Sequence, residues 1–399
     1  ITALGVGIAA SIGSGTELGV ALSGGGAGAV NTVTLLTAAQ VKDGLADQTS
    51  PLTLTTKGGL TLNATSASTI VADTNGFSAA LASGRNGGGS GSIGLSVSTN
   101  WINDTVAAEI KNANVTLTGG GVVDVGASMA DSIKALSLGG SASGGQGRGA
   151  ISSSGAGSSN TVTGNVSAVV DGAALMHLNK GSLSIHAEDK ASIDADAGGV
   201  GLGASIGGVN GSYGLSIGAA AAVNTITNTV LARLDGSAVL NGTNINIAAH
   251  SAAAIDALTW AVAGAVAAGD GSINAAGAGA GSSNMITSTV SAELKNQQNL
   301  TLAGNLNVEA SDTSSIHAQA GGGALSVAAS NKVGLAVAVG AVDSHNTINS
   351  TVKALIYSDK GVAPTLNVDG NVNVTATTAQ TITALGVGIA ASIGSGTEL

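Results

Sequence analysis

The stretch INIAAHSAAAIDA, residues 245–257, contains the two signatures that determine the fold of this chain. The first, INIAA, has the form apolar-x-apolar-x-Ala and ends at Ala249. The second has the form Ile-x-Ala and begins six residues later, at Ile255. Alternation with a period of two places successive side chains on opposite faces of a β-strand, so the stretch predicts strand rather than helix.

Both signatures recur along the chain at a constant offset. Ile-x-Ala begins at Ile1, Ile70, Ile133, Ile193, Ile255, Ile316 and Ile382. The apolar-x-apolar-x-Ala signature ends six residues before each of the last six, at Ala64, Ala127, Ala187, Ala249, Ala310 and Ala376. A third marker is an Asn that precedes a strand-like run, at Asn31, Asn100, Asn160, Asn224, Asn284 and Asn346. These markers define six units of about 63 residues that start near residues 1, 70, 133, 193, 255 and 316.

The six units form one longer period. The sequence ITALGVGIAASIGSGTEL occupies residues 1–18 and returns unchanged at residues 382–399. Residues 1–381 therefore constitute one period, and residues 382–399 are the start of the next. Because the chain begins with Ile1 and contains no recognisable signal peptide or terminal anchor, we expect it to be a segment of a longer tandem array.

The composition predicts an ordered chain with a thin core. The 399 residues include 63 Gly, 2 Pro, no Cys and only five aromatic residues. A hydrophobic content of 44% and a mean hydropathy of +0.40 argue against disorder. No stretch approaches the ~18–20 uninterrupted apolar residues of a spanning helix, so we expect no membrane-spanning segment. The core must consist of small and β-branched side chains, because large aromatic anchors are missing.

Short strands, frequent turns and a unit that cannot bury its own apolar face are typical of a solenoid. We predict an all-β fold, a parallel β-helix of six units that is open at both ends. The sequence does not choose between a two-sided and a three-sided winding, and a right-handed winding is expected only as the commoner outcome for parallel crossovers. With ~20 residues per coil, each unit would make three coils and contain about six strands, and one period would rise ~86 Å. The alternative is a string of six antiparallel sandwich domains. Domains of this size with few large side chains would be marginally stable, and no distinct linkers separate the units.

Charge and end sequences indicate which partners to expect. The chain has 13 Lys+Arg against 23 Asp+Glu, a net charge of −10, and its basic residues are scattered. Nucleic acid is therefore not an expected partner. The absence of Cys suits an exported chain. Neither end of the chain has a capping sequence, and an uncapped strand edge is a template for another strand, so the expected partners are further copies stacked end to end.

The densest group of titratable residues lies in SIHAEDKASIDADA, residues 184–197. Alternation places His186 and Glu188 on the outward face, and Asp194 and Asp196 likewise. Such residues are weak candidates for a divalent-cation site or an acid/base pair. The positions equivalent to Asp194 in the other units are Thr2, Val71, Lys134, Asp256 and His317. We therefore interpret the group as a solvated outer face and predict no catalytic, cofactor or metal site.

Two other patterns do not indicate a site. The glycine-rich run GVGIAASIG lacks the GK[ST] ending of a phosphate-binding loop. Flat arrays of Thr-x-Thr pairs would suggest ice binding, and such pairs occur at Thr53/Thr55 and Thr116/Thr118. The corresponding stretches of other units contain Leu-Asn-Lys or Leu-Asn-Gly, so we expect no array.

The recurring pattern NTxxxTVxAxI, followed by the two signatures and Gly/Ala-rich runs, resembles the repeats of leukotoxin-type giant filamentous adhesins. These bacterial surface proteins are related in style to filamentous haemagglutinins. The resemblance extends over residues 1–381 and includes no catalytic motif. It implies a long β-helix at the cell surface that mediates adhesion or forms fibres, although the near-perfect long period of this chain favours assembly of many periods.

Three functional hypotheses follow. The first is a non-enzymatic structural segment of an extracellular filament or adhesive stalk. The second is a binding module whose loops, such as Gly84–Gly89 and Gly208–Ser212, contact a surface glycan or a neighbouring cell. The third, which we disfavour, is a carbohydrate-active enzyme that uses the acidic face around Asp194.

Overall fold

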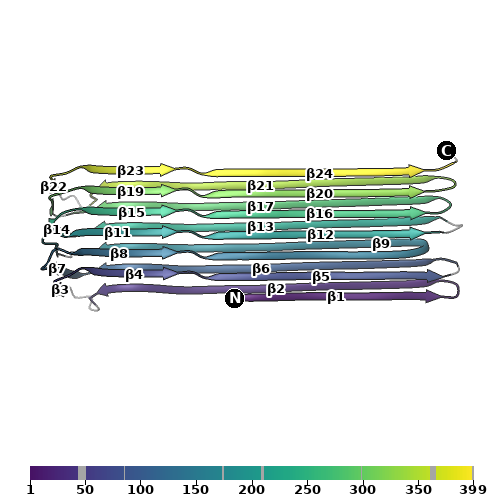
Figure 1. The fold of residues 1–399 in the computed structure, drawn as a ribbon, viewed down its shortest axis with the longest axis horizontal. Helices are drawn as coiled ribbons and strands as arrows, with labels where there is room; N and C mark the ends of the chain where they lie inside the picture. Colours follow the sequence, from purple (N-terminus) through teal and green to yellow (C-terminus); the bar gives the residue numbers. More distant parts are fainter. Residues whose placement is uncertain are drawn as a thin grey trace.

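The computed structural model describes residues 1–43, 51–84, 86–172, 175–207, 211–297, 299–359 and 365–397. These residues form 24 β-strands, and all strand pairs among them are parallel. Equivalent strands lie side by side in successive units, as Figure 1 shows. The predicted all-β solenoid is therefore confirmed. The described ranges contain no helix of the length and apolar character needed to cross a membrane.

Each unit of the sequence makes one turn of the solenoid. In one such turn, β4 and β5 run along the long axis of the molecule, β6 returns, and β7 closes the end (Figure 1). Wall A contains β1 (Thr2–Gly15), β5 (Thr69–Gly84), the first part of β9 (Ser132–Asp171), β12 (Ser192–Ile206), β16 (Ala254–Ala268), β20 (Ser315–Ala329) and β24 (Thr381–Ser395). Wall B contains β2 (Gly19–Lys42), β6 (Gly88–Lys111), the second part of β9, β13 (Ser212–Asp235), β17 (Ser272–Lys295) and β21 (Gly334–Tyr357).

Two shorter sheets complete the turn at the end of the molecule opposite the C-terminus (Figure 1). Sheet C contains β3 (Leu52–Thr56), β7 (Ala113–Leu117), β10 (Leu175–His177), β14 (Ala238–Gly242), β18 (Asn299–Leu302) and β22 (Thr365–Val368). Sheet D contains β4 (Leu60–Ser66), β8 (Val122–Met129), β11 (Ser182–Asp189), β15 (Ile245–Ser251), β19 (Leu306–Asp312) and β23 (Val372–Thr378). Sheet D leads directly into wall A. The bend that joins the two sheets lies within the six residues that separate the two sequence signatures, so the length of this segment is the same in every turn.

The sequence signatures mark the register of the ladder. Ile193 pairs with both Ile133 and Ile255 in wall A, and Ala187 pairs with both Ala127 and Ala249 in sheet D. The unit of about 63 residues read from the sequence is thus confirmed as the length of chain between one strand and the equivalent strand in the next turn.

The predicted coil of about 20 residues, with three coils and six strands per unit, is wrong. A unit contains four strands and makes a single turn, because strands such as β13 extend over 24 residues without a bend. Such long strands are possible because two walls of small residues pack face to face along most of their length. Six turns at ~4.8 Å spacing rise ~29 Å per period, about a third of the expected value.

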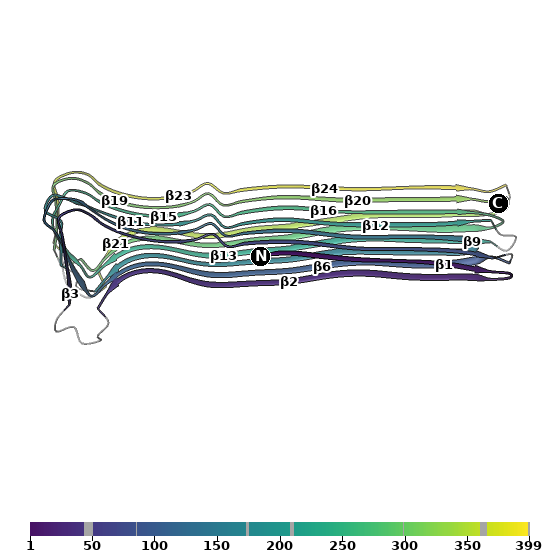
Figure 2. The same cartoon turned by 60° about the horizontal axis from the view of Figure 1, so that its bottom comes forward.

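The interior has two regions with different side chains. At the end closed by sheets C and D, the cross-section is wide, as Figure 2 shows, and contains a continuous core of Val, Ile, Leu and Met. Val106, Ala108 and Ile110 of β6, which alternate along the strand, are all fully buried there. In the narrow region the walls touch mainly through Gly, Ala and Ser, with a few buried polar residues such as Thr74 and Thr259. A Cβ atom on Gly199, for example, would overlap the carbonyl oxygen of Ala219 on the facing wall.

The large apolar side chains of the narrow region point outward. Ile8 is 76% exposed and Ile12 is 82% exposed, whereas their inward neighbours are Gly7 and Gly13. The polar-outside pattern of sheet D is therefore reversed over much of walls A and B. Apolar side chains lie outside here because the space between the walls admits only small ones.

Candidate functional surfaces

The four weak candidate ligands His186, Glu188, Asp194 and Asp196 do not converge on one another. His186 Nδ1 lies 3.3 Å from Asp124 Oδ1 in the neighbouring turn, and Glu188 forms an ion pair of 2.6 Å with Lys190. Asp194 lies beside Asp256 and Lys134 in the ladder of wall A. Burial raises the pKa of Asp196, and the negative charges of Asp194 and Asp256 raise it further. Within the described part of the chain, no three His, Asp or Glu side chains gather as metal ligands would.

The Asn markers form a buried ladder inside wall B. The side-chain amide of each Asn donates to the Oδ1 of the Asn in the next turn at 2.8 Å, from Asn31 through to Asn346. Asn224 at the centre is fully buried and both donates and accepts. The Asn that precedes each strand-like run is therefore a structural element that ties successive turns together.

Buried carboxylates at the bend between sheet D and wall A were not anticipated. Asp189 accepts hydrogen bonds from the side chain of Asn228 and, at 3.2 Å, from the backbone N–H of Ala191. Two turns away, Asp312 accepts from Ser350 and from the N–H of Ser314. An acidic residue within the invariant six-residue bend was the sequence signal that could have identified them.

Two further buried carboxylates, Asp104 and Asp131, lie close together near the bend in the first turns of the solenoid. The hydroxyl of Ser68 donates to Asp104 at 2.6 Å, and its backbone N–H donates to Asp131 at 2.8 Å. Both carboxylates are buried. Burial raises the pKa of Asp131 to about 6, and the proximity of Asp104 adds to this effect. Burial likewise raises the pKa of Asp189 to about 7.

Replacing Asp189 with asparagine is expected to remove a pH dependence of folding. The folded chain keeps a proton on Asp189 up to a pKa of about 7, whereas the unfolded chain releases it near the ordinary aspartate pKa of 3.8. The stabilisation from this proton is complete below pH 3.8 and is lost as the pH rises to about 7. Urea unfolding of Asp189→Asn should therefore show a shallower decline of stability over this interval and a higher stability at pH 8. The exposed Asp343→Asn serves as the control and should follow the original chain; identical profiles for both variants would contradict the expectation.

The outward face of wall B contains a grid of threonines, contrary to the expectation that no array exists. Three successive outward positions in each turn, aligned in register, are occupied mostly by Thr. The members are Thr32, Thr34, Thr105, Thr161, Thr163, Thr225, Thr227, Thr229, Thr287, Thr289, Thr347 and Thr351. The pairs considered from the sequence, Thr53/Thr55 and Thr116/Thr118, lie instead in and next to the short sheet C. The grid was missed because the threonines that follow the Asn markers were interpreted only as part of a strand-like run.

The loops considered for glycan binding are only partly described. Arg85 in the Gly84–Gly89 loop and residues 208–210 in the Gly208–Ser212 loop lie outside the described residues.

Both ends of the ladder present open strand edges within the described ranges. Among the described strands, β1 pairs only with β5, and β24 pairs only with β20. β24 has the sequence of β1 and is placed on β20 with Ile382 opposite Ile316. The first strand of the period thus fits on the last turn of the period in the standard register.

Comparison of the chain with protein-family models, with curated proteins and with solved structures found no match.

Proposed function

We propose that this chain is a structural segment of an extracellular filament or adhesive stalk, a stiff rod in which periods stack end to end. The observation that carries the proposal is the placement of β24 on β20. Because β24 and β1 share one sequence, the same contact can join one period to the next. The resemblance to filamentous adhesins favours the same function.

The Asn ladder supports this direction of growth. At one end, no described group donates to Oδ1 of Asn31. At the other end, Oδ1 of Asn346 accepts from Asn284, and among the described residues its Nδ2 donates only within its own strand, to Oγ of Ser344 at 2.9 Å. A following period would bring its own Asn31 beside Asn346, where the free acceptor of one meets the amide donor of the other. The ladder would then continue without interruption across the junction.

The open edges support stacking energetically. β20 and β24 pair over 15 residues, and β17 and β21 pair over 24 residues. A following period would add pairs of the same lengths, and the backbone groups of a bare edge otherwise remain available to any other strand. Stacking would also cover the last turn of the Val, Ile and Leu core, whose members such as Val352 and Ile356 are only partly buried.

The proposal is tested on a chain of two periods, in which residues 19–399 follow Leu399 directly. Electron microscopy and small-angle scattering should show one continuous rod with an unchanged cross-section, longer by ~29 Å than the single period. Ala384→Lys in the joining strand should break the rod, because the following turn would bury this inward-facing charge. Thr383→Lys, its outward-facing neighbour, should leave the rod intact. Two separate bodies in the unsubstituted chain would refute the proposal.

A further inference from the structure

The outer face of wall A is a large uncharged apolar surface. We define it by five successive outward positions on each of its seven strands, from Val6 to Ser14 in β1 and from Trp260 to Ala268 in β16. None of these positions carries a charged residue, although the chain has a net charge of −10. Side chains on it remain well exposed, for example Ile206 at 62% and Ile389 at 63%. Monomeric proteins rarely leave contiguous apolar patches of more than a few hundred Å² in water.

The surface is also flat. The strands of wall A run nearly parallel, with little twist, as Figure 1 shows. Large rings do not protrude from it, because the ring of Phe77 lies over Gly140 and the ring of Trp260 lies over Gly198, where a Cβ atom would collide with them. Flat sheets of many strands are unusual and are typically stabilised by stacking against another sheet.

The size of the surface matches that of a stable interface. Nine residues of strand and six intervals between strands give ~30 Å by ~29 Å, or about 900 Å². Specific interfaces bury ~800 Å² on each partner. A second copy of this chain presents the same area, the same flatness and the same spacing between rungs, so all rows can make contact at once.

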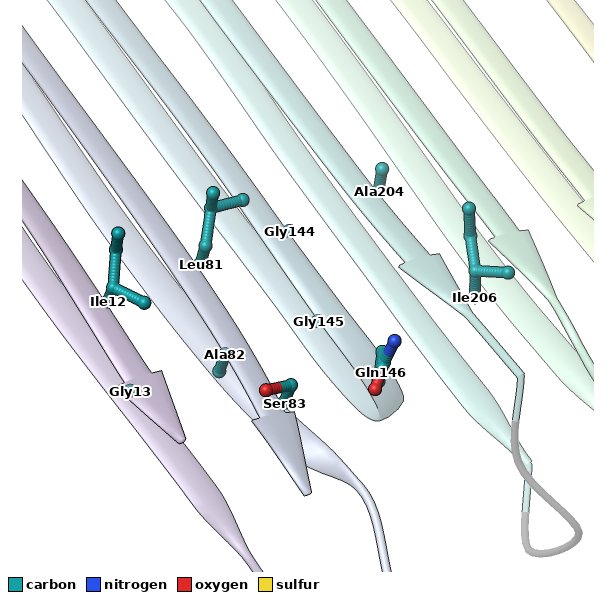
Figure 3. A pocket seen from close by; sticks show the side chains of 10 residues that line it. All are labelled: Ile12, Gly13, Leu81, Ala82, Ser83, Gly144, Gly145, Gln146, Ala204 and Ile206. Atoms are coloured by element: carbon teal, nitrogen blue, oxygen red, sulfur yellow. The ribbon is translucent and has the colours of Figure 1, made fainter. Parts of the chain in front are cut away.

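The relief of the surface is self-complementary. A hollow of about 390 Å³ has Gly144 and Gly145 as its floor, and Leu81 and Ile206 lie on opposite sides of it, as Figure 3 shows. Gly144 lies one strand before Ala204 on the central strand β12, and Val266 lies one strand after it in the same row. A two-fold axis parallel to β12 would therefore place Val266 of one copy over the hollow of the other.

We propose that wall A is a lateral interface, through which two copies of this chain pair face to face with their solenoid axes antiparallel. This pairing is distinct from the end-to-end stacking proposed above and does not depend on it. It buries the outward Leu, Ile and Val side chains between two flat sheets and leaves the threonine grid of wall B accessible on both sides of the pair. The pair of solenoids would then have an additional apolar core between the two copies, besides the core inside each solenoid.

Sedimentation analysis of the full chain tests the pairing. The chain is expected to be a dimer, and Leu202→Lys is expected to raise its dissociation constant at least about tenfold, because like charges would meet across the two-fold axis. Leu202 lies on the central strand and is 49% exposed, so the variant should fold, which circular dichroism will check. Thr227→Lys in the same turn on wall B is the matched control and should remain a dimer.

Mixing two variants gives a sharper criterion. Leu202→Lys mixed with Leu202→Glu should restore dimers, since opposite charges would meet only if this residue contacts its own counterpart. Failure of the mixture to pair, or a monomeric original chain, would overturn the proposal. Binding of the original chain as a monomer to phosphatidylcholine vesicles would also overturn it, by identifying a membrane as the occupant of this surface. Ala384→Lys in the single-period chain should still dimerise, which separates this test from that of end-to-end stacking.

Discussion

Replacing Gly199 with valine is expected to prevent stable folding of the solenoid. Gly199 faces inward from wall A, and even a Cβ atom there would overlap the carbonyl oxygen of Ala219 in wall B. Because the opposing atom belongs to the backbone of a paired strand, the side chain cannot be accommodated unless the two walls separate. Overpacking and backbone displacement on this scale cost roughly 4 kcal/mol or more. Urea unfolding followed by circular dichroism measures the effect.

The matched control is Gly277→Val. Gly277 lies on β17 in wall B with its missing side chain directed outward, and no atom lies within 4 Å of the position a Cβ would take. Valine suits a strand surface, so this variant should change the free energy of unfolding by less than ~1 kcal/mol. If Gly199→Val and Gly277→Val are equally stable, the close contact between the walls does not exist.

Replacing Asn224 with leucine is expected to have the second-largest effect. The substitution removes two hydrogen bonds from the ladder and leaves the amide of Asn160 and the Oδ1 of Asn284 without partners in a buried position. An unsatisfied buried polar group costs ~1–3 kcal/mol, so the loss should total about 2–6 kcal/mol. Thermal and urea unfolding should both detect it.

An exposed Asn pair provides the control for the ladder. Asn373 donates to Asn307 with the same distance of 2.8 Å, but at an exposed position. Water can replace this hydrogen bond, so Asn373→Ala should cost less than ~0.5 kcal/mol. Equal effects of the two substitutions would show that burial of the ladder contributes nothing to its strength.

The rungs of the ladder could be predicted from the sequence because their markers are local. Ile193 and Ala187 lie on either side of a six-residue bend in one turn, and their equivalents repeat this spacing in every other turn. Alternation also identified the buried face where one face is apolar and the other polar, as at Val106 and Glu109. The fold class and the register both follow from these patterns.

The number of turns per unit could not be predicted, because alternation does not determine how far a strand runs before it bends. In β1, Gly7 and Ile8 belong to a period-two alternation of small and large side chains. Such a pattern suggests that the large side chain is buried, yet Ile8 is the exposed residue and Gly7 faces inward. Which side chain faces inward depends on how close the facing wall lies. The position of that wall depends on contacts between residues some 20 positions apart, such as Gly199 and Ala219. For the same reason, the apolar surface of wall A and the threonine grid appeared only when the strands were aligned.

The buried carboxylates were missed for a different reason. Asp189 occupies the bend in one turn, whereas the equivalent positions in adjacent turns are Met129 and Ser251. A residue present in some units and absent from others gives no periodic signal, and its burial depends on Asn228 from wall B.

The distance between two labels is the most direct test of one turn per unit. The chain has no Cys, so single cysteines at Thr34 and Asn349 can carry spin labels without interference. Both positions face outward in the same row of wall B, in the first and sixth turns. Five rungs at ~4.8 Å predict a separation of ~24 Å, whereas three coils per unit would place the labels ~72 Å apart. A distance distribution centred near the longer value would contradict the architecture described here.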